Sequence, residues 1–186
     1  MFTIKNFTDN DDIRTLETKG AFTVIEYLRD LSVTAADAQV AYFSNKMNVR
    51  KRQVICDLSA SDVTTQAGAM QWTVGDVNAT TGVKGVGDLF GKALRGSVTG
   101  ESAIKPEYTG NGILVLEPTY KHIILINVAD WNGSIVLDDG LFLLGHAVHG
   151  QRGHELFLEL ALVGIFNART IYYHLTIGPQ VAALCV

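Results

Sequence analysis

Apolar residues in the middle of the chain come in short runs, each about the length of a β-strand. Between about residues 53 and 139 the runs are rich in β-branched residues and are separated by Gly, Asn and Asp. Runs of roughly five to eight residues between turn-forming residues are typical of strands. The runs are RQVICDLS, AMQWTV, SAIKPEYT, GILVLEP, KHIILINV and GSIVLDD. This pattern predicts an all-β (mainly β) fold.

Three dipeptides beside these runs are typical of tight hairpins. They are Asn111-Gly112, Asn132-Gly133 and Asp139-Gly140. Asn-Gly and Asp-Gly pairs adopt the positive φ angles that two-residue hairpin turns require. We therefore expect antiparallel hairpins at these positions.

The β region contains a faint internal repeat. VICDLSASDVTTQAGAMQW and ILINVADWNGSIVLDDGLFL share the order of apolar strand, polar turn and second apolar strand. Two stacked β modules would produce this order, because one small sheet cannot bury its apolar face alone. Chance similarity is the alternative. The repeat predicts a single domain over 1–186, with an N-terminal cap (1–45), a first module (46–121) and a second, diverged module (122–186).

The two ends of the chain are less regular. FTVIEYLRD alternates like a strand, whereas SVTAADAQVAYFS fits either a helical turn or an edge segment. Near the C-terminus, HELFLELALVGIF has apolar residues on nearly every face, so periodicity does not separate a helix from a buried strand.

The Gly-rich stretch GVKGVGDLFGKALRG (82–96) is present only in the first module. It fits neither a P-loop nor a dinucleotide fingerprint, because the glycine spacing is wrong and Ala93 follows Gly91-Lys92. We expect instead a short helix near 88–95, which Asp88 caps. Its apolar side would dock on the β core, a neighbouring subunit or a membrane, through Leu89, Phe90 and Leu94.

Several of these segments together resemble a known family. QAGAMQW, TTGVKGVGDLFGKALRGSVTGESAI, GNGILVLEPTYKHIILI and GSIVLDDGLFL are similar to the altered inheritance of mitochondria protein 24 family. The resemblance covers roughly residues 42 to 143. It implies the β fold of the tryptophan RNA-binding attenuation protein (TRAP-like), a double-stranded β-helix or β-sandwich.

The resemblance implies little about biochemistry. Family members are usually oligomeric and have no established catalysis, and the fungal ones are associated with organisation of the mitochondrial inner membrane. After about Leu143 this chain departs from the family pattern, and a shortened or diverged end leads us to expect an unpaired sheet edge.

Composition narrows the class of protein. The chain has 186 residues, is 47% apolar and has a formal net charge of −4, which argues against general attraction to nucleic acid or anionic membranes. Cys56 and Cys185 are not spaced as zinc ligands are. We interpret them as reduced thiols of a cytosolic protein. We find no signal peptide and no apolar run long enough to cross a bilayer. The expected location is cytoplasmic, and no cofactor is expected.

Three histidines are candidate metal ligands. His146, His149 and His154 lie close together and are followed by Glu155. Imidazole and carboxylate groups suit zinc or iron. However, the spacing of the first two would place them on opposite faces of a strand, and glycines in this stretch argue against a helix. We therefore interpret them as solvated loop residues and expect no metal.

A basic segment provides the alternative function. KMNVRKR concentrates Lys46, Arg50, Lys51 and Arg52 in an otherwise acidic protein. Such a patch would bind the phosphates of RNA or of anionic lipids. Tyr42 and Phe43 are its only nearby aromatic residues, so stacking on single-stranded bases is poorly supported.

We find no arrangement of residues typical of a catalytic site. GESAI lacks the second glycine of a nucleophile elbow. The sequence therefore predicts a non-enzymatic, homo-oligomeric β scaffold that recruits a protein or membrane partner through the Gly-rich loop and its short helix. The alternative is a polyanion-binding module that uses the basic segment.

Overall fold

The structure is a computed structural model that describes residues 4–80, 105–127, 130, 141–146 and 181–185. Within these residues the helix is α1 (Ala38–Lys46). The strands are β1 (Ile13–Lys19), β2 (Phe22–Tyr27), β3 (Arg52–Asp57), β4 (Val63–Thr65), β5 (Met70–Thr80), β6 (Glu107–Leu116), β7 (Ile123–Asn127), β8 (Phe142–His146) and β9 (Val181–Cys185).

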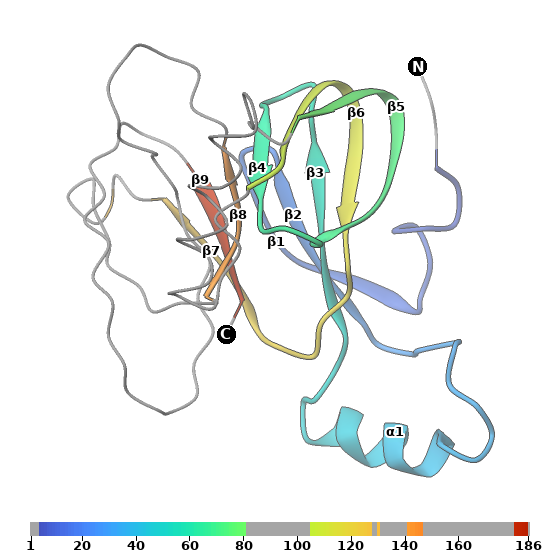
Figure 1. The fold of residues 1–186 in the computed structure, drawn as a ribbon. Helices are drawn as coiled ribbons and strands as arrows, with labels where there is room; N and C mark the ends of the chain where they lie inside the picture. The colour runs from blue at the N-terminus through green and yellow to red at the C-terminus, as the bar shows by residue number, and fades with distance from the viewer. Residues whose placement is uncertain (1–3, 81–104, 128–129, 131–140, 147–180, 186) are drawn as a thin grey trace.

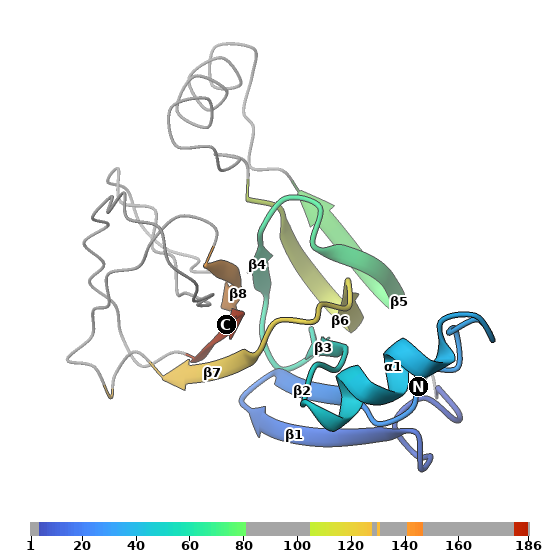
Figure 2. The same ribbon diagram turned by 90° about the horizontal axis from the view of Figure 1, so that it is seen from below.

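The described strands form one antiparallel sheet that curls into a half-barrel (Figures 1 and 2). Their order is β1-β2-β3-β6-β4-β8-β9-β7, and β5 pairs with β6 outside this path. The curl brings the two end strands of the path together: the Lys19 ammonium group on β1 donates a hydrogen bond to the Leu125 carbonyl on β7 at 2.9 Å. β9 pairs with both β7 and β8, so the last described strand lies inside the sheet and not at its edge.

The hydrophobic core lies on the concave side of the curled sheet. Alternate residues of β2, β3 and β6 point into it, as the two-residue period of a strand requires. Its fully buried members include Phe22, Val24, Val54, Leu114 and Leu144. The β-branched and aromatic runs that predicted strands therefore supply the core directly.

The prediction of a tight hairpin at Asn111-Gly112 is wrong, because β6 continues through this pair and is hydrogen-bonded to β5 along its length. The glycines serve a different purpose. A Cβ atom on Gly112 would lie 2.4 Å from the Val74 carbonyl oxygen, and one on Gly110, whose φ is +120°, would lie 2.3 Å from that of Asp76. Glycine is needed here because the backbone of β5 comes so close.

The all-β prediction is confirmed. Two of the predicted runs, SAIKPEYT and GILVLEP, contribute to the single strand β6, whereas GSIVLDD lies outside the described residues. The helix predicted near 88–95 also lies outside them. The described helix is α1, in the segment that the sequence left open between a helical turn and an edge segment. The division at residues 45 and 121 stays a prediction.

Candidate interaction surface

Residues 31–49 form an arm that extends beyond one end of the strands (Figure 1). At its base the Thr34 hydroxyl donates a hydrogen bond to the Asp37 carboxylate at 2.5 Å, just before α1 begins. The helix stops at Met47 because Asn48 adopts a left-handed conformation with φ of 63°. The Val49 amide then donates to the Ser44 carbonyl at 2.9 Å, as in a Schellman motif.

One side of α1 is fastened to the body of the protein. The Asn45 side chain donates a hydrogen bond to the Leu28 carbonyl at 2.8 Å and accepts one from Arg50 Nε at 2.8 Å. No residue of α1 is buried. The helix is therefore tied to the body by hydrogen bonds, although it contributes no side chain to the core.

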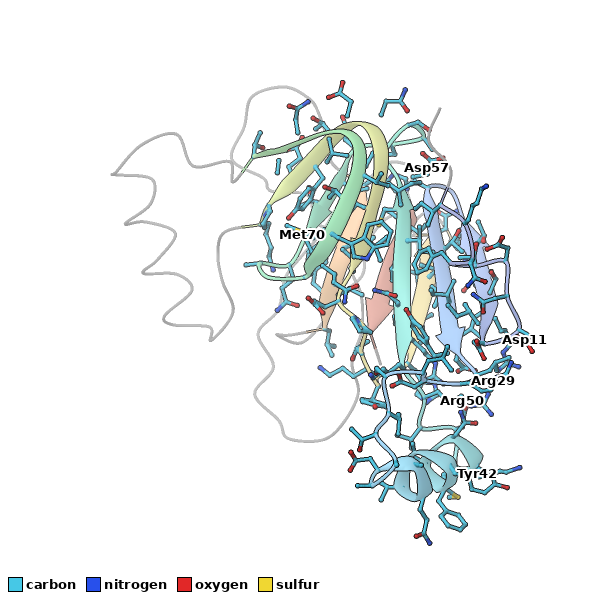
Figure 3. All side chains as sticks on the ribbon, turned by 90° about the vertical axis from the view of Figure 1, so that its right-hand side faces the viewer. Asp11, Arg29, Tyr42, Arg50, Asp57 and Met70 are labelled. Carbon is cyan, nitrogen blue, oxygen red and sulfur yellow. The ribbon has the colours of Figure 1, made fainter. Side chains whose placement is uncertain are left out.

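The arm carries most of the exposed large apolar side chains of the described residues. Six of their eleven exposed large apolar side chains lie on it: Leu31, Val40, Tyr42, Phe43, Met47 and Val49. Figure 3 places Tyr42 on the helix, away from the sheet. Apolar side chains gathered in this way, rather than scattered singly, are typical of an interaction site.

Three of these side chains share one face of the helix. Val40, Phe43 and Met47 are three and four residues apart, so they line up along one side, which we call the ridge. They are 68%, 57% and 77% exposed, respectively. The sequence contains this spacing, but the spacing indicates a ridge only if the segment is a helix, and SVTAADAQVAYFS fits an edge segment as well.

A groove of about 1100 Å³ separates the inner side of α1 from the end of the sheet. Its walls include Leu31 and Val49 from the arm and Tyr27 and Tyr120 from the body. Lys51 spans part of it, with an ion pair of 2.6 Å to Asp30. Val40 of the ridge also lines the groove, whereas Phe43 and Met47 are not among its lining residues.

The four basic residues of the predicted polyanion site do not form one exposed patch. The Lys46 ammonium group lies over the Tyr42 ring, 5.2 Å from its centroid. Lys51 is engaged by Asp30, whereas Arg50 and Arg52 turn inward. Arg52 is only 2% exposed, which argues against its use as a phosphate ligand.

Arg50 and Arg52 are brought together by a buried carboxylate. Glu26 Oε1 accepts hydrogen bonds from Arg14 at 2.6 Å and Arg50 at 3.0 Å, and Oε2 pairs with Arg52 at 2.7 Å. We call these four residues the Glu26 cluster. Burial of Glu26 favours its neutral form and by itself raises its pKa. The hydrogen bonds from Arg50 and Arg14 and the charge of Arg52 outweigh the effect of burial, so the pKa of Glu26 is lowered. The cluster therefore binds the start of β3 to β1 and β2.

Of the three candidate metal ligands, the described residues include only His146. Its Nδ1 lies 2.5 Å from the Ser61 hydroxyl oxygen, and its ring packs on Phe22 with centroids 4.7 Å apart. Burial lowers the pKa of His146. His149 and His154 lie outside the described residues, in which no group of three His, Cys, Asp or Glu side chains is placed to hold a metal ion.

The predicted partner-binding residues Leu89, Phe90 and Leu94 also lie outside the described part of the chain. Cys56 is a buried free thiol, and burial raises its pKa. Within the described residues, no helix is long and apolar enough to span a bilayer.

A family model described as "Mitochondrial biogenesis AIM24" matches residues 45–148. The chain belongs to the AIM24 family. This confirms the resemblance seen in QAGAMQW and the Gly-rich stretch. The matched range begins at residue 45, so most of α1 precedes it.

Among solved structures, the chain is similar to protein SPYM3_0169 from Streptococcus pyogenes. The two are 22% identical with a TM-score of 0.46, and the match covers 75% of this chain and 60% of that one. No curated protein matches the chain.

Proposed function

We propose that this AIM24-family chain is a non-catalytic, oligomeric β scaffold that acts by docking other molecules on exposed apolar segments. The observation that carries the proposal is the concentration of exposed apolar side chains on the arm. Because α1 is hydrogen-bonded to the body through Asn45 yet buries none of its residues, the arm presents these side chains to solvent. Surfaces of this kind favour protein–protein contact.

The Gly-rich segment is the second recruitment element of the proposal. Leu89, Phe90 and Leu94 are the residues that we expect to contact a protein or membrane partner. Replacing Leu89 and Phe90 by Ser should remove that binding and leave the unfolding transition unchanged. Should the double variant unfold instead, the segment belongs to the core and recruits nothing.

The first test is the mass of the intact chain in solution. We expect size-exclusion chromatography with light scattering, at low and high salt, to give an oligomer whose mass does not fall with salt, since apolar contacts are not screened by ions. A monomer under all conditions would remove the oligomeric part of the proposal.

The second candidate function is polyanion binding by Lys46 and Lys51, whose side chains line the groove beside α1. Replacing all four basic residues is a poor test, because loss of Arg52 would leave Glu26 buried without its partner. The variant Lys46→Ala/Lys51→Ala avoids this problem. If the alternative holds, binding of wild-type chain to an RNA homopolymer falls steeply with salt and is weakened in this variant.

A further inference from the structure

We propose that the groove between α1 and the end of the sheet binds a free single-chain amphiphile, a long alkyl chain that ends in one acidic group, as in a fatty acid. The acidic group pairs with Lys46, and the alkyl chain covers the apolar walls of the groove. The inference goes beyond the proposed scaffold, because it assigns a small-molecule ligand and does not depend on the oligomeric state.

The walls of the groove are apolar on both sides. Apolar and aromatic side chains come from the arm and from the body: Leu31, Val33, Val40 and Val49, and Tyr27 and Tyr120. Leu31 is 81% exposed and Val40 is 68% exposed, so the described part of the protein does not cover them. A ligand that covers them removes apolar surface from water, which is the usual source of affinity in small-molecule sites.

Most polar side chains of the walls already have partners within the protein. The Tyr27 hydroxyl donates a hydrogen bond of 2.6 Å to the side-chain oxygen of the buried Gln53, so this hydroxyl is not available to a ligand. The Asn45 side chain is bonded to the Leu28 carbonyl and to Arg50. A ligand with many polar groups finds few free partners on such walls, whereas an alkyl chain needs none.

The charges that line the groove favour an anion. Its described residues include four cations and two carboxylates, namely Arg29, Lys46, Arg50 and Lys51, and Asp30 and Asp37. Three of the cations are already paired with acidic residues: Lys51 with Asp30, Arg50 with Glu26, and Arg29 with Asp11 and Asp12. Figure 3 shows Arg29 and Arg50 at the end of the sheet that lies nearest α1.

Lys46 is the cation that remains for a ligand. Among the described residues it has no carboxylate partner, and its ammonium group lies 5.2 Å from the centroid of the Tyr42 ring. An ammonium group has three N–H donors, so a contact with one ring leaves donors for an acidic group. Asp37 lies at the opposite end of α1 and accepts a hydrogen bond from Thr34. The groove is therefore suited to one negative charge.

The size of the groove favours a small ligand over a helix of a protein partner. Its volume of about 1100 Å³ lies just above the roughly 300–1,000 Å³ of typical small-molecule sites, which suits a long molecule. An α-helix is about 10–12 Å across, so the same volume would hold only roughly two turns of it. Binding to a membrane surface usually takes a cluster of about four to eight basic residues, and here one lysine is unpaired.

The test is displacement of a fluorescent fatty acid from the full chain by palmitate, at concentrations below those that form micelles. Leu31→Ser/Val40→Ser removes two apolar side chains from the groove. Phe43→Ser/Met47→Ser is the matched control, because both of its side chains are exposed on the same arm but do not line the groove. We expect the groove variant to bind palmitate at least about 10-fold more weakly and the control to bind it as wild type does.

A second comparison tests the acidic group. Hexadecanol has the same alkyl chain as palmitate without the charge, and wild type should bind it about threefold more weakly, as expected for an exposed ion pair. Lys46→Gln should lower the affinity for palmitate to that for hexadecanol and leave hexadecanol binding unchanged. Lys5→Gln, an exposed lysine outside the groove, is the control. All replaced residues are exposed, and urea unfolding checks that each variant keeps the fold.

Each other outcome overturns the inference. A wild-type chain that binds neither the fluorescent fatty acid nor palmitate has no such site, and the oligomeric scaffold is then unaffected. If the groove variant binds palmitate as tightly as wild type, the ligand lies elsewhere. If wild type binds palmitate and hexadecanol equally, Lys46 does not hold an acidic group. A chain that ignores free palmitate but sediments with vesicles of anionic phospholipid docks on a membrane surface instead.

Discussion

Residues at the start of β3 are buried, whereas residues of similar type on the arm that precedes it are exposed. In β3, Arg52 and Val54 are almost completely buried, and the arginine has a carboxylate partner in Glu26. On the arm, Phe43 and Met47 are mostly exposed, only a few residues earlier in the chain. A strand inside a curled sheet has neighbours on both edges and a covered face, whereas α1 touches the body along one side only. Residue type alone therefore does not decide whether an apolar segment fills the core or remains available to a partner.

The largest loss of folding stability that we predict follows from replacing Glu26, the buried carboxylate that pairs with Arg52. Glu26→Gln keeps the shape of the side chain but removes the charge that faces three arginines, one of them buried. Leaving a buried charge without its partner costs about 3–5 kcal/mol. We expect urea unfolding to report a loss of this size. The control is Glu17→Gln, which breaks the exposed 3.2 Å pair with Lys19 and should cost less than about 1 kcal/mol.

The Glu26 cluster also makes the stability of the fold depend on pH in the acid range. The pKa of Glu26 is lower in the folded chain than its ordinary value of 4.5. Its contribution is therefore complete above that pH and is lost as the pH falls through the lower, folded value. Glu26→Gln should lack this part of the acid-induced loss of stability. An identical acid profile in both chains would show that the cluster does not stabilise the fold.

A smaller loss is expected where β5 and β6 come closest. Gly112→Ala would place a methyl group against the Val74 carbonyl and the Val77 side chain, both at 2.4 Å, so the strands must separate locally. Overpacking of this kind costs about 1–3 kcal/mol. Gly68→Ala, at a φ of +78° with no atom near the new methyl group, reports the separate cost of a positive φ. A Gly112→Ala chain as stable as wild type would contradict the close approach of the strands.

Replacing His146 should have a still smaller effect on stability, and this effect should depend on pH. Because burial against Phe22 lowers the pKa of His146, its contribution is complete above the ordinary value of 6.5 and is lost as the pH falls below it. We expect the melting temperature of wild type to fall more between pH 7 and pH 5 than that of His146→Gln (about the range in which histidine titrates). The exposed His122→Gln is the control, and equal slopes in all three chains would contradict the prediction.

The strands were predictable because their cause is local. RQVICD and IILIN have β-branched residues and turn-forming neighbours, and they are the strands β3 and β7. Asn111-Gly112 was misread because an Asn-Gly pair and a glycine needed for close strand packing look alike in sequence. Only the register of β5 against β6, which joins residues far apart in the chain, separates the two.

The candidate surface was harder to predict for a different reason. The basic segment was treated as one patch, yet Arg52 enters the sheet and pairs with Glu26, a residue 26 positions earlier. The ridge of Val40, Phe43 and Met47 depends on a nine-residue helix with one anchoring side chain. The local sequence does not indicate whether such a helix packs into the core. Its burial depends on how the surrounding strands fill the available space.

The smallest effect on stability is predicted at the arm itself. Phe43→Ser/Met47→Ser removes two large apolar side chains but empties no buried space, since both are exposed. Surface substitutions usually change the free energy of unfolding by less than about 0.5 kcal/mol. Measured by urea unfolding at a protein concentration low enough to keep the chain monomeric, the double variant should match wild type. A loss comparable to that of Glu26→Gln would mean that the ridge packs against the body, and its apolar surface would then serve folding and not association.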